Sequence, residues 1–166
     1  MSETVSAARV YLLLGANLGD RLHTFEQARI RIANQIGPTV LQSSLYETAA
    51  WGVTNQPTYL NQVLVVATYL EPAAVLTYTL AIEESLGRRR TEKWGARVID
   101  IDLLFYDDLI VDTPTLTLPH PLLHERRFTL VPLAELAPAF VHPVLHQTIQ
   151  TLLAHCSDES EVIKFS

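Results

Sequence analysis

The alternation of apolar and polar positions changes its period along the chain, and each change marks an element. Apolar runs bounded by Gly, Pro and polar clusters predict strands at 9–15, 40–47, 59–69 and 97–105. Apolar residues three and four positions apart predict helices over 21–36 and 72–86, of which the first ends at Gly37-Pro38 and the second begins at Pro72. The order strand, helix, strand, strand, helix, strand predicts an α+β domain with the ferredoxin-like βαββαβ sandwich.

The remaining chain adds short C-terminal strands and helices to this sandwich. We expect short strands at 109–111 and 115–118, a turn and short helix over 119–128, and helices over 130–136 and 146–155. The whole chain, 1–166, then forms a single domain, with 1–8 and 157–166 predicted to fray at its ends. A ferredoxin-like sheet carries its two helices on one face, so the other face is expected to be free for a site.

The strand predicted at 97–105 carries the first candidate chemistry. Because side chains alternate along a strand, Asp100 and Asp102 lie on one face. The opposite face is wholly apolar and belongs to a core; it comprises Ile99, Ile101, Leu103 and Phe105. Two carboxylates this close disfavour each other's ionisation, which a hard cation such as Mg²⁺ would relieve. A strand edge with two solvated charges is the alternative for the pair taken alone.

A cluster of cations precedes that strand. Five of the 12 Lys and Arg residues lie within 88–97, in a chain whose net charge is -6. They are Arg88, Arg89, Arg90, Lys93 and Arg97. The planar guanidinium of Arg donates two parallel hydrogen bonds to phosphate, so the cluster indicates a polyanion site. A solvated loop after a helix is the alternative, but it fits poorly with Trp94-Gly95 inside the cluster.

Composition excludes several classes of protein. The chain has 166 residues, 48% of them hydrophobic, which suits one globular domain. No apolar run approaches the roughly 20 residues of a membrane span, and the polar stretch 1–8 lacks a signal-peptide core. The single Cys156 fits a reducing cytoplasm, and the acidic net charge argues against nucleic-acid binding. We expect a cytoplasmic monomer that acts on small molecules, without nucleic-acid or membrane partners.

Two other pairs of residues invite a functional interpretation. His120 and His124 have the i, i+4 spacing of zinc ligands, but HPLLH lacks the Glu of H-E-x-x-H and contains Pro121, which disfavours zinc. Tyr59 and Asn61 share one face at the start of a predicted strand. An Asn there is either bonded within the fold or contacts the polar edge of a ligand.

Three stretches, taken in order, resemble a known family. Residues 87–105, GRRRTEKWGARVIDIDLLF, resemble its G-R-x-R-x-x-x-W-G-x-R-x-x-D-x-D segment. The second stretch is Tyr59-Leu60-Asn61 after Gln56-Pro57, and the third is Leu118-Pro119-His120 with Arg126 and Phe128. From YLLLGANLGDR to LPHPLLHERRFTLVPLAELAP, the chain resembles the 6-hydroxymethyl-7,8-dihydropterin pyrophosphokinase family.

This resemblance implies a Mg²⁺-dependent transferase of folate biosynthesis. The enzyme would transfer pyrophosphate from ATP to the hydroxymethyl group of 6-hydroxymethyl-7,8-dihydropterin, giving AMP and the pterin diphosphate. The resemblance also implies a ferredoxin-like fold and two Mg²⁺ ions, held by Asp100 and Asp102. Arg88 and Arg97 would join these two residues as catalytic groups that contact the phosphates.

The resemblance assigns further residues to the two substrates. The pterin contacts would be Thr48, Tyr59, Asn61, Trp94 and Phe128. The ATP contacts would be Glu83, Arg88, Arg90, Trp94, Arg97, His120 and Arg126. Without the resemblance, Glu83 is interpreted as a surface charge unless the basic cluster folds back on it. Four residues depart from the family's pattern and affect the expected contacts: Leu80, Pro121, Trp51 and Arg89.

Two other function classes fit the same scaffold. A ferredoxin-like module could bind a ligand without catalysis, although such a module needs no acidic pair. A nucleotidyltransferase could use the same Mg²⁺ and nucleotide. The products separate these possibilities, because nucleotidyl transfer releases pyrophosphate and pyrophosphoryl transfer releases AMP.

Overall fold

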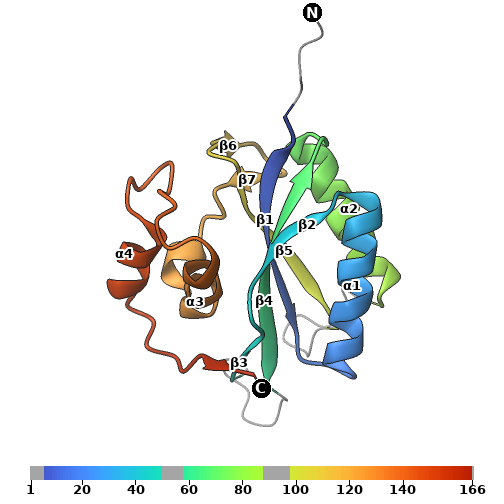
Figure 1. Cartoon of the computed structure of the whole chain (residues 1–166), viewed down its shortest axis with the longest axis horizontal. Helices are drawn as coiled ribbons and strands as arrows, with labels where there is room; N and C mark the ends of the chain where they lie inside the picture. The colour runs from blue at the N-terminus through green and yellow to red at the C-terminus, as the bar shows by residue number, and fades with distance from the viewer. Residues whose placement is uncertain (1–5, 50–57, 88–97, 166) are drawn as a thin grey trace, which may run out of the picture.

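A computed structural model describes residues 6–49, 58–87 and 98–165 of the chain (Figure 1). In chain order the elements are β1 (Ala8–Ala16), α1 (Arg21–Gln35), β2 (Thr39–Gln42), β3 (Tyr46–Thr48), β4 (Tyr59–Thr68), α2 (Pro72–Ser85), β5 (Asp100–Tyr106), β6 (Val111–Asp112), β7 (Thr117–Leu118), the 3-10 helix η1 (Leu123–Glu125), α3 (Arg127–Leu136), α4 (Ile149–Ala154) and β8 (Ile163–Lys164). Within the described residues, no helix is long and apolar enough to cross a bilayer.

The main sheet has the strand order β5-β1-β4-β3-β8, and β2 also pairs with β4. All of its pairings are antiparallel. β1 and β4 lie at its centre and read as nearly continuous apolar runs, because both faces of the sheet are covered. The predicted α+β class and ferredoxin-like topology are confirmed.

Helices α1 and α2 cover one face of the sheet (Figure 1). Phe25, Ala28 and Ile32 of α1 are fully buried against it, as the helical spacing predicts. Leu22, three positions before Phe25, has the same helical spacing but is 48% exposed. It lies in the first turn of α1, immediately after Asp20, whose carboxylate accepts a hydrogen bond from His23 N at 3.1 Å and caps the helix.

The opposite face of the sheet is not free, contrary to the sequence prediction. Figure 1 shows α3 and α4 on this side, and they bury a second core of their own against Tyr11, Leu13, Val63 and Val65 of the sheet. The residues that they contribute are Leu130, Leu133, Ile149 and Leu152. The helices of the C-terminal third therefore leave only part of this face for a site.

A β-bulge in β5 changes which side chains face which core. Leu12 of β1 pairs with Leu103, whereas the preceding Tyr11 pairs with Phe105, so Leu104 is an extra residue in β5. Leu103 packs on the α1/α2 side and Phe105 packs on the α3/α4 side. The prediction that these two residues share one apolar face is wrong, because strict alternation stops at the bulge.

The strand predicted at 40–47 is divided into β2 and β3 at Ser43. The hydroxyl of this buried residue accepts a hydrogen bond from Val63 N at 2.9 Å, and Ser43 N donates to Val63 O at 2.9 Å. Gln62 Nε2 donates to Ser43 O at 2.8 Å. A Ser side chain that bonds the neighbouring backbone competes with regular strand pairing, which explains the interruption.

The C-terminal elements also differ from their predicted bounds. α3 begins at Arg127 rather than 130, and the short strands shift to β6 and β7. The helix expected over 146–155 spans only α4, because His146 has a φ of 57° and Thr148 caps the helix by accepting from Thr151 N at 3.1 Å. The tail expected to fray from residue 157 instead forms β8 on the edge of β3.

Glu135 of α3 fastens this helix to the chain between β2 and β3. Its carboxylate accepts hydrogen bonds from Ser44 N at 2.9 Å, from the Ser44 hydroxyl at 3.2 Å and from the Tyr46 hydroxyl. Burial by itself raises the pKa of Glu135, but these bonds and the charge of Lys164 outweigh it and lower the pKa. Burial and the Glu135 hydrogen bond raise the pKa of Tyr46 to about 12.

Replacing Glu135 by Gln is expected to lower the free energy of unfolding at pH 7 by about 0.5–1 kcal/mol, a value reduced for solvent screening because the residue is exposed. Because the folded-state pKa lies below the unfolded one, the carboxylate stabilises the fold above the unfolded pKa. This contribution is lost as the pH falls through the folded pKa, so the gap between the two proteins should close in acid. Urea unfolding at pH 7 and at lower pH values tests this, and a gap that widened in acid would contradict it.

Candidate active site

The acidic pair lies on β5, an edge strand of the main sheet. Asp100 pairs with Gly15 and Asp102 with Leu13 across β1. Leu13 faces the α3/α4 core, so both carboxylates project from that side of the sheet, and both are partly exposed. Ile101 between them is buried on the α1/α2 side. The predicted placement of the two Asp residues on one face, backed by apolar neighbours, is confirmed.

Asp100 and Asp102 both line a pocket of about 350 Å³ between α2, β5 and the β6–β7 hairpin. The α2 and β5 walls are Leu76, Leu80, Glu83, Asp100, Ile101, Asp102 and Leu103. The facing wall is Thr113, Pro114, Thr115, Leu116 and Thr117, with His120 and Pro121 after it. The pocket therefore has apolar side chains at Leu76 and Leu80 of α2 and acidic ones at Glu83 and along β5, a combination that suits a small molecule with an apolar ring and a charged end.

Glu83 of α2 is buried, which corrects its interpretation as a surface charge. It is 4% exposed, and its carboxylate accepts a hydrogen bond from the backbone N–H of Ile101 at 2.6 Å. Ile101 stands between Asp100 and Asp102, so Glu83 holds the segment of β5 that carries both carboxylates. A buried carboxylate in this position ties α2 to the acidic pair.

His120 lines the pocket, and the charge of Arg126 acts on it. His120 N donates to the carbonyl of the bulge residue Leu104 at 3.0 Å, and His120 Nδ1 accepts from Leu122 N at 3.2 Å. Burial and then the charge of Arg126 lower the pKa of His120, so its imidazole is neutral at pH 7. The guanidinium carbon of Arg126 lies 5.7 Å from the centre of the Phe128 ring.

A second group of predicted site residues lies on the same face of the sheet, on the strands β3 and β4. Thr48 pairs with Tyr59, and Asn61 pairs with Gly15, which in turn pairs with Asp100. Asn61 is buried, and its Nδ2 donates to the Thr48 hydroxyl at 3.0 Å. A Cβ at Gly15 would be in ordinary van der Waals contact with Asn61 Oδ1, at 3.4 Å, and would occupy the space that glycine leaves between Asn61 and the acidic pair.

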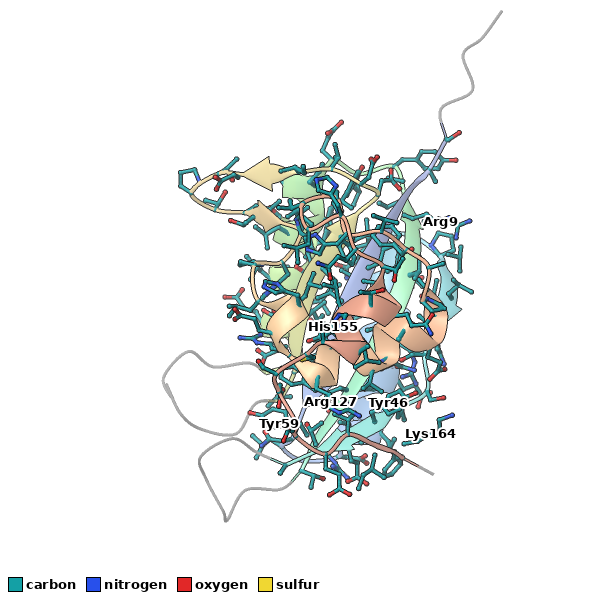
Figure 2. The ribbon with its side chains drawn as sticks, turned by 90° about the vertical axis from the view of Figure 1, so that its left-hand side faces the viewer. Arg9, Tyr46, Tyr59, Arg127, His155 and Lys164 are labelled. Carbon is teal, nitrogen blue, oxygen red and sulfur yellow. The ribbon has the colours of Figure 1, made fainter. Side chains whose placement is uncertain are left out.

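Phe128 lies in the first turn of α3 and packs against the core of that side. In Figure 2, Tyr59 and Arg127 are labelled at the same end of the molecule, Arg127 in the first turn of α3 and Tyr59 at the start of β4. Two aromatic residues, one from the sheet and one from α3, thus belong to the end of the sheet that carries Asn61. The structure brings together Thr48, Tyr59, Asn61, Asp100 and Asp102 on one face.

Several predicted site residues lie outside the described residues. They are Arg88, Arg90, Trp94 and Arg97, together with Arg89 and Trp51 among the departures from the family's pattern. Of the other departures, Leu80 and Pro121 both line the pocket. Among the described residues, no group of three or more His, Cys, Asp and Glu could hold a metal ion.

Two features of the site are not evident in the sequence. Residues 115–117 of the hairpin wall were interpreted only as part of a short strand, and 113–114 were not assigned, although this run of Thr and Pro is a turn signal. The network of Arg21 was not anticipated: its Nη1 donates to Thr58 O at 2.9 Å and to the Thr58 hydroxyl at 2.8 Å. A lone Arg at the start of a helix gives no sign of such a long-range contact.

Comparison with known proteins agrees with this geometry. Residues 11–138 match the family described as 7,8-dihydro-6-hydroxymethylpterin-pyrophosphokinase (HPPK). A 2-amino-4-hydroxy-6-hydroxymethyldihydropteridine pyrophosphokinase of Methylorubrum extorquens is 42% identical over 147 residues, which cover 88% of this chain and 92% of the relative. A protein of the same name from Aquifex aeolicus is 38% identical over 143 residues, covering 86% of this chain and 89% of that one.

Solved structures show the same fold. Wild-type Plasmodium falciparum HPPK-DHPS with pteroate superposes with a TM-score of 0.73 at 18% identity, over 93% of this chain. The matched part is 43% of that longer chain, so this protein spans less than half of it. Sequence match, curated relatives and fold agree, and the chain belongs to the 7,8-dihydro-6-hydroxymethylpterin-pyrophosphokinase family.

Proposed function

We propose that this pyrophosphokinase transfers pyrophosphate from ATP to the hydroxymethyl group of 6-hydroxymethyl-7,8-dihydropterin through the residues of the candidate active site. Membership of the family makes the chain an enzyme of folate biosynthesis with ATP as its co-substrate. The observation that carries the residue assignment is the placement of Asp100 and Asp102 between a pocket and the Thr48–Asn61 pair. One substrate would occupy each side of the acidic pair.

The pocket beside α2 is proposed to hold the nucleotide. Leu76, Leu80 and Leu103 offer apolar contacts to the base, while the neutral His120 offers its other ring nitrogen as a hydrogen-bond donor. Glu83 lines the same pocket and holds β5 in place. Arg126 would contact the phosphates, and Arg90 and Trp94 are predicted from the resemblance to contact ATP.

Asp100 and Asp102 are proposed to hold two Mg²⁺ ions. The donor set fits, because carboxylate oxygens are hard ligands and Mg²⁺ usually takes one or two protein carboxylates together with phosphate oxygens and water. When bound, Mg²⁺ supplies charge neutralisation of the transferring phosphates and acidifies an attacking hydroxyl. Arg88 and Arg97 would add guanidinium hydrogen bonds to the same phosphates. The two carboxylates orient the reacting groups at the junction of the two substrate sites.

The pterin is proposed to lie over the start of β4. Tyr59 and Phe128 would stack on the two faces of the ring. The hydrogen bond from Asn61 Nδ2 to Thr48 orients the amide, so that Asn61 Oδ1 is directed to accept a hydrogen bond from the polar edge of the pterin. Trp94 would complete this site. Gly15 leaves the space through which the hydroxymethyl group reaches the acidic pair.

A nucleotide-product assay tests the function. The purified protein is mixed with ATP, Mg²⁺ and 6-hydroxymethyl-7,8-dihydropterin, and the nucleotides are separated by chromatography. AMP formed in equal amount to the pterin diphosphate, and only with Mg²⁺, supports the proposal. Release of pyrophosphate in place of AMP would indicate nucleotidyl transfer, and pterin binding without any nucleotide product would indicate a non-catalytic module.

We further propose that the protein works as a monomer in the cytoplasm, without nucleic-acid partners. The net charge is -6, and the single Cys156 has no second cysteine in the chain with which to form a disulfide. Small molecules are the substrates of the family. Light scattering after size-exclusion chromatography tests the monomer, and a dimer mass would contradict it.

A further inference from the structure

The C-terminal strap, residues 158–165, crosses from the first turn of α3 to the outer edge of the sheet. Figure 1 shows this segment passing from the α3/α4 side to β3 at the end of the sheet away from β6 and β7. The strap lies beyond residue 138, where the match to the family ends. It is attached at two points: the first is next to Phe128, and the second is connected to Tyr59 through Arg21 and Thr58.

The first attachment is at α3. The residue preceding the helix, Arg126, makes no capping hydrogen bond with its side chain. Instead, Asp158 Oδ2 accepts a hydrogen bond from Arg127 N at 3.0 Å, and Asp158 Oδ1 accepts from Ser160 N at 2.9 Å. Burial by itself raises the pKa of Asp158, but its bonds to Ser160 and Arg127 outweigh it and lower the pKa. Asp158 therefore caps α3 from 31 residues away, directly before Phe128.

The second attachment is at β3 and Arg21. β8 pairs with Tyr46 and Glu47 of β3, and Phe165 N donates to Leu45 O at 2.8 Å. The ring of Phe165 lies 5.9 Å from the guanidinium carbon of Arg21. In Figure 2, Tyr46, Tyr59 and Lys164 are labelled at this same end of the molecule.

Arg21 connects this second attachment to Thr58, the residue before β4. Its Nη1 donates to the carbonyl and hydroxyl oxygens of Thr58, at 2.9 and 2.8 Å, and it forms an ion pair with Glu47 at 3.5 Å. The Thr58 hydroxyl donates to Glu47 at 2.6 Å, which closes the network. Thr58 directly precedes Tyr59, so this network fixes the backbone from which the Tyr59 side chain projects.

We propose that the C-terminal strap sets the separation of the two aromatic residues that enclose the pterin, with Asp158 and Phe165 as positioning residues. This inference rests on the proposed function, because it uses Tyr59 and Phe128 as the two walls. Each wall follows an anchored residue, Thr58 or Arg127, by one position. Loss of an anchor would loosen one wall and weaken pterin binding, while the pocket between α2 and the β6–β7 hairpin would keep its shape.

Direct binding measurements on the full chain test the strap. Asp158→Ala is expected to raise the dissociation constant for 6-hydroxymethyl-7,8-dihydropterin about fivefold, and Phe165→Ala about threefold. Binding of a non-hydrolysable ATP analogue should stay within about twofold. Asp158→Asn keeps an acceptor oxygen and should recover most of the loss. Glu159→Ala is the matched control, because it removes an exposed carboxylate one residue away.

Two outcomes would overturn the inference. One is a pterin dissociation constant for Asp158→Ala equal to that of Glu159→Ala. The other is an equal loss of pterin and ATP-analogue binding with a lower Tm, which would indicate a merely structural role. Failure of the proposed function is a separate result, in which the wild type binds no pterin. Amide hydrogen exchange at Arg127, whose N–H donates to Asp158, still decides the strap in that case: it should accelerate in Asp158→Ala and not in Glu159→Ala.

Discussion

Replacing Asp102 by Ala is expected to reduce kcat/KM about a thousandfold, which corresponds to about 4 kcal/mol of transition-state stabilisation. Asp102 lines the pocket and shares its face of β5 with Asp100, at the junction of the two proposed substrate sites. Without one carboxylate, the remaining one must hold the charge of the metal and phosphates alone. Asp100→Ala should have an effect of the same order, and the double variant should cost less than the product of the two, since both residues are proposed to hold the same Mg²⁺ ions.

The measurement is AMP release over a range of Mg²⁺ concentrations. The variants should require more Mg²⁺ for half-maximal activity as well as turning over slowly. Asp108→Ala is the matched control, because it removes an exposed carboxylate from the turn after the same strand. Near-normal turnover by Asp100→Ala or Asp102→Ala at ordinary Mg²⁺ would remove these residues from the proposed mechanism.

Replacing Glu83 by Ala is expected to lower kcat/KM about 30-fold, or about 2 kcal/mol. The substitution leaves the buried N–H of Ile101 without its acceptor, and that N–H lies between the two Asp residues of β5. The start of the strand should then shift, so the Mg²⁺ requirement should rise together with the KM for ATP. The thermal unfolding temperature should fall as well, because a buried donor loses its partner.

Two further variants separate positioning by Glu83 from a general loss of stability. Glu83→Gln keeps the length of the side chain and one acceptor oxygen, so it should recover most of the activity. Glu84→Ala removes the neighbouring exposed carboxylate of α2 and should change neither the activity nor the Mg²⁺ requirement. If Glu83→Ala lowered the unfolding temperature but left the Mg²⁺ requirement unchanged, Glu83 would only support the fold.

The sequence predicts the main helices and strands of this fold because the spacing of apolar residues and the Gly and Pro residues at element ends are local signals. Gly37-Pro38 and Pro72 mark helix ends, and the apolar runs of β1 and β4 identify the central strands. The bulge at Leu104 and the interruption at Ser43 escape such a prediction, because each depends on the pairing of two strands distant in sequence. The same is true of the strap, whose attachments to Arg127 and β3 appear only in the folded chain.

Some residues of the candidate site could likewise be predicted from the sequence, and others could not. Alternation along one strand suffices to place Asp100 and Asp102 together, and the strand register confirms it. The burial of Glu83 could not be predicted, because a charged residue on a helix is usually exposed and its partner is a backbone N–H 18 residues away. The roles of Arg88, Arg90, Trp94 and Arg97 stay predictions from the resemblance.

The two terminal segments lie at opposite ends of the sheet, and this determines where a tag can be fused to the protein. β1 starts at Ala8, paired with Thr68, at the opposite end of the sheet from Gly15 and its neighbours Asn61 and Asp100. The strap, in contrast, finishes against β3 at the end that carries Thr48 (Figure 1). An affinity tag or a fluorescent reporter placed before β1 is thus held a full strand length from the proposed site at Asn61 and Asp100. The same addition after the strap would follow Phe165, whose N–H bonds Leu45 O beside β3, and could disturb the pairing of β8 with that strand. Kinetic work on this enzyme is therefore best done with the tag at the N-terminal end.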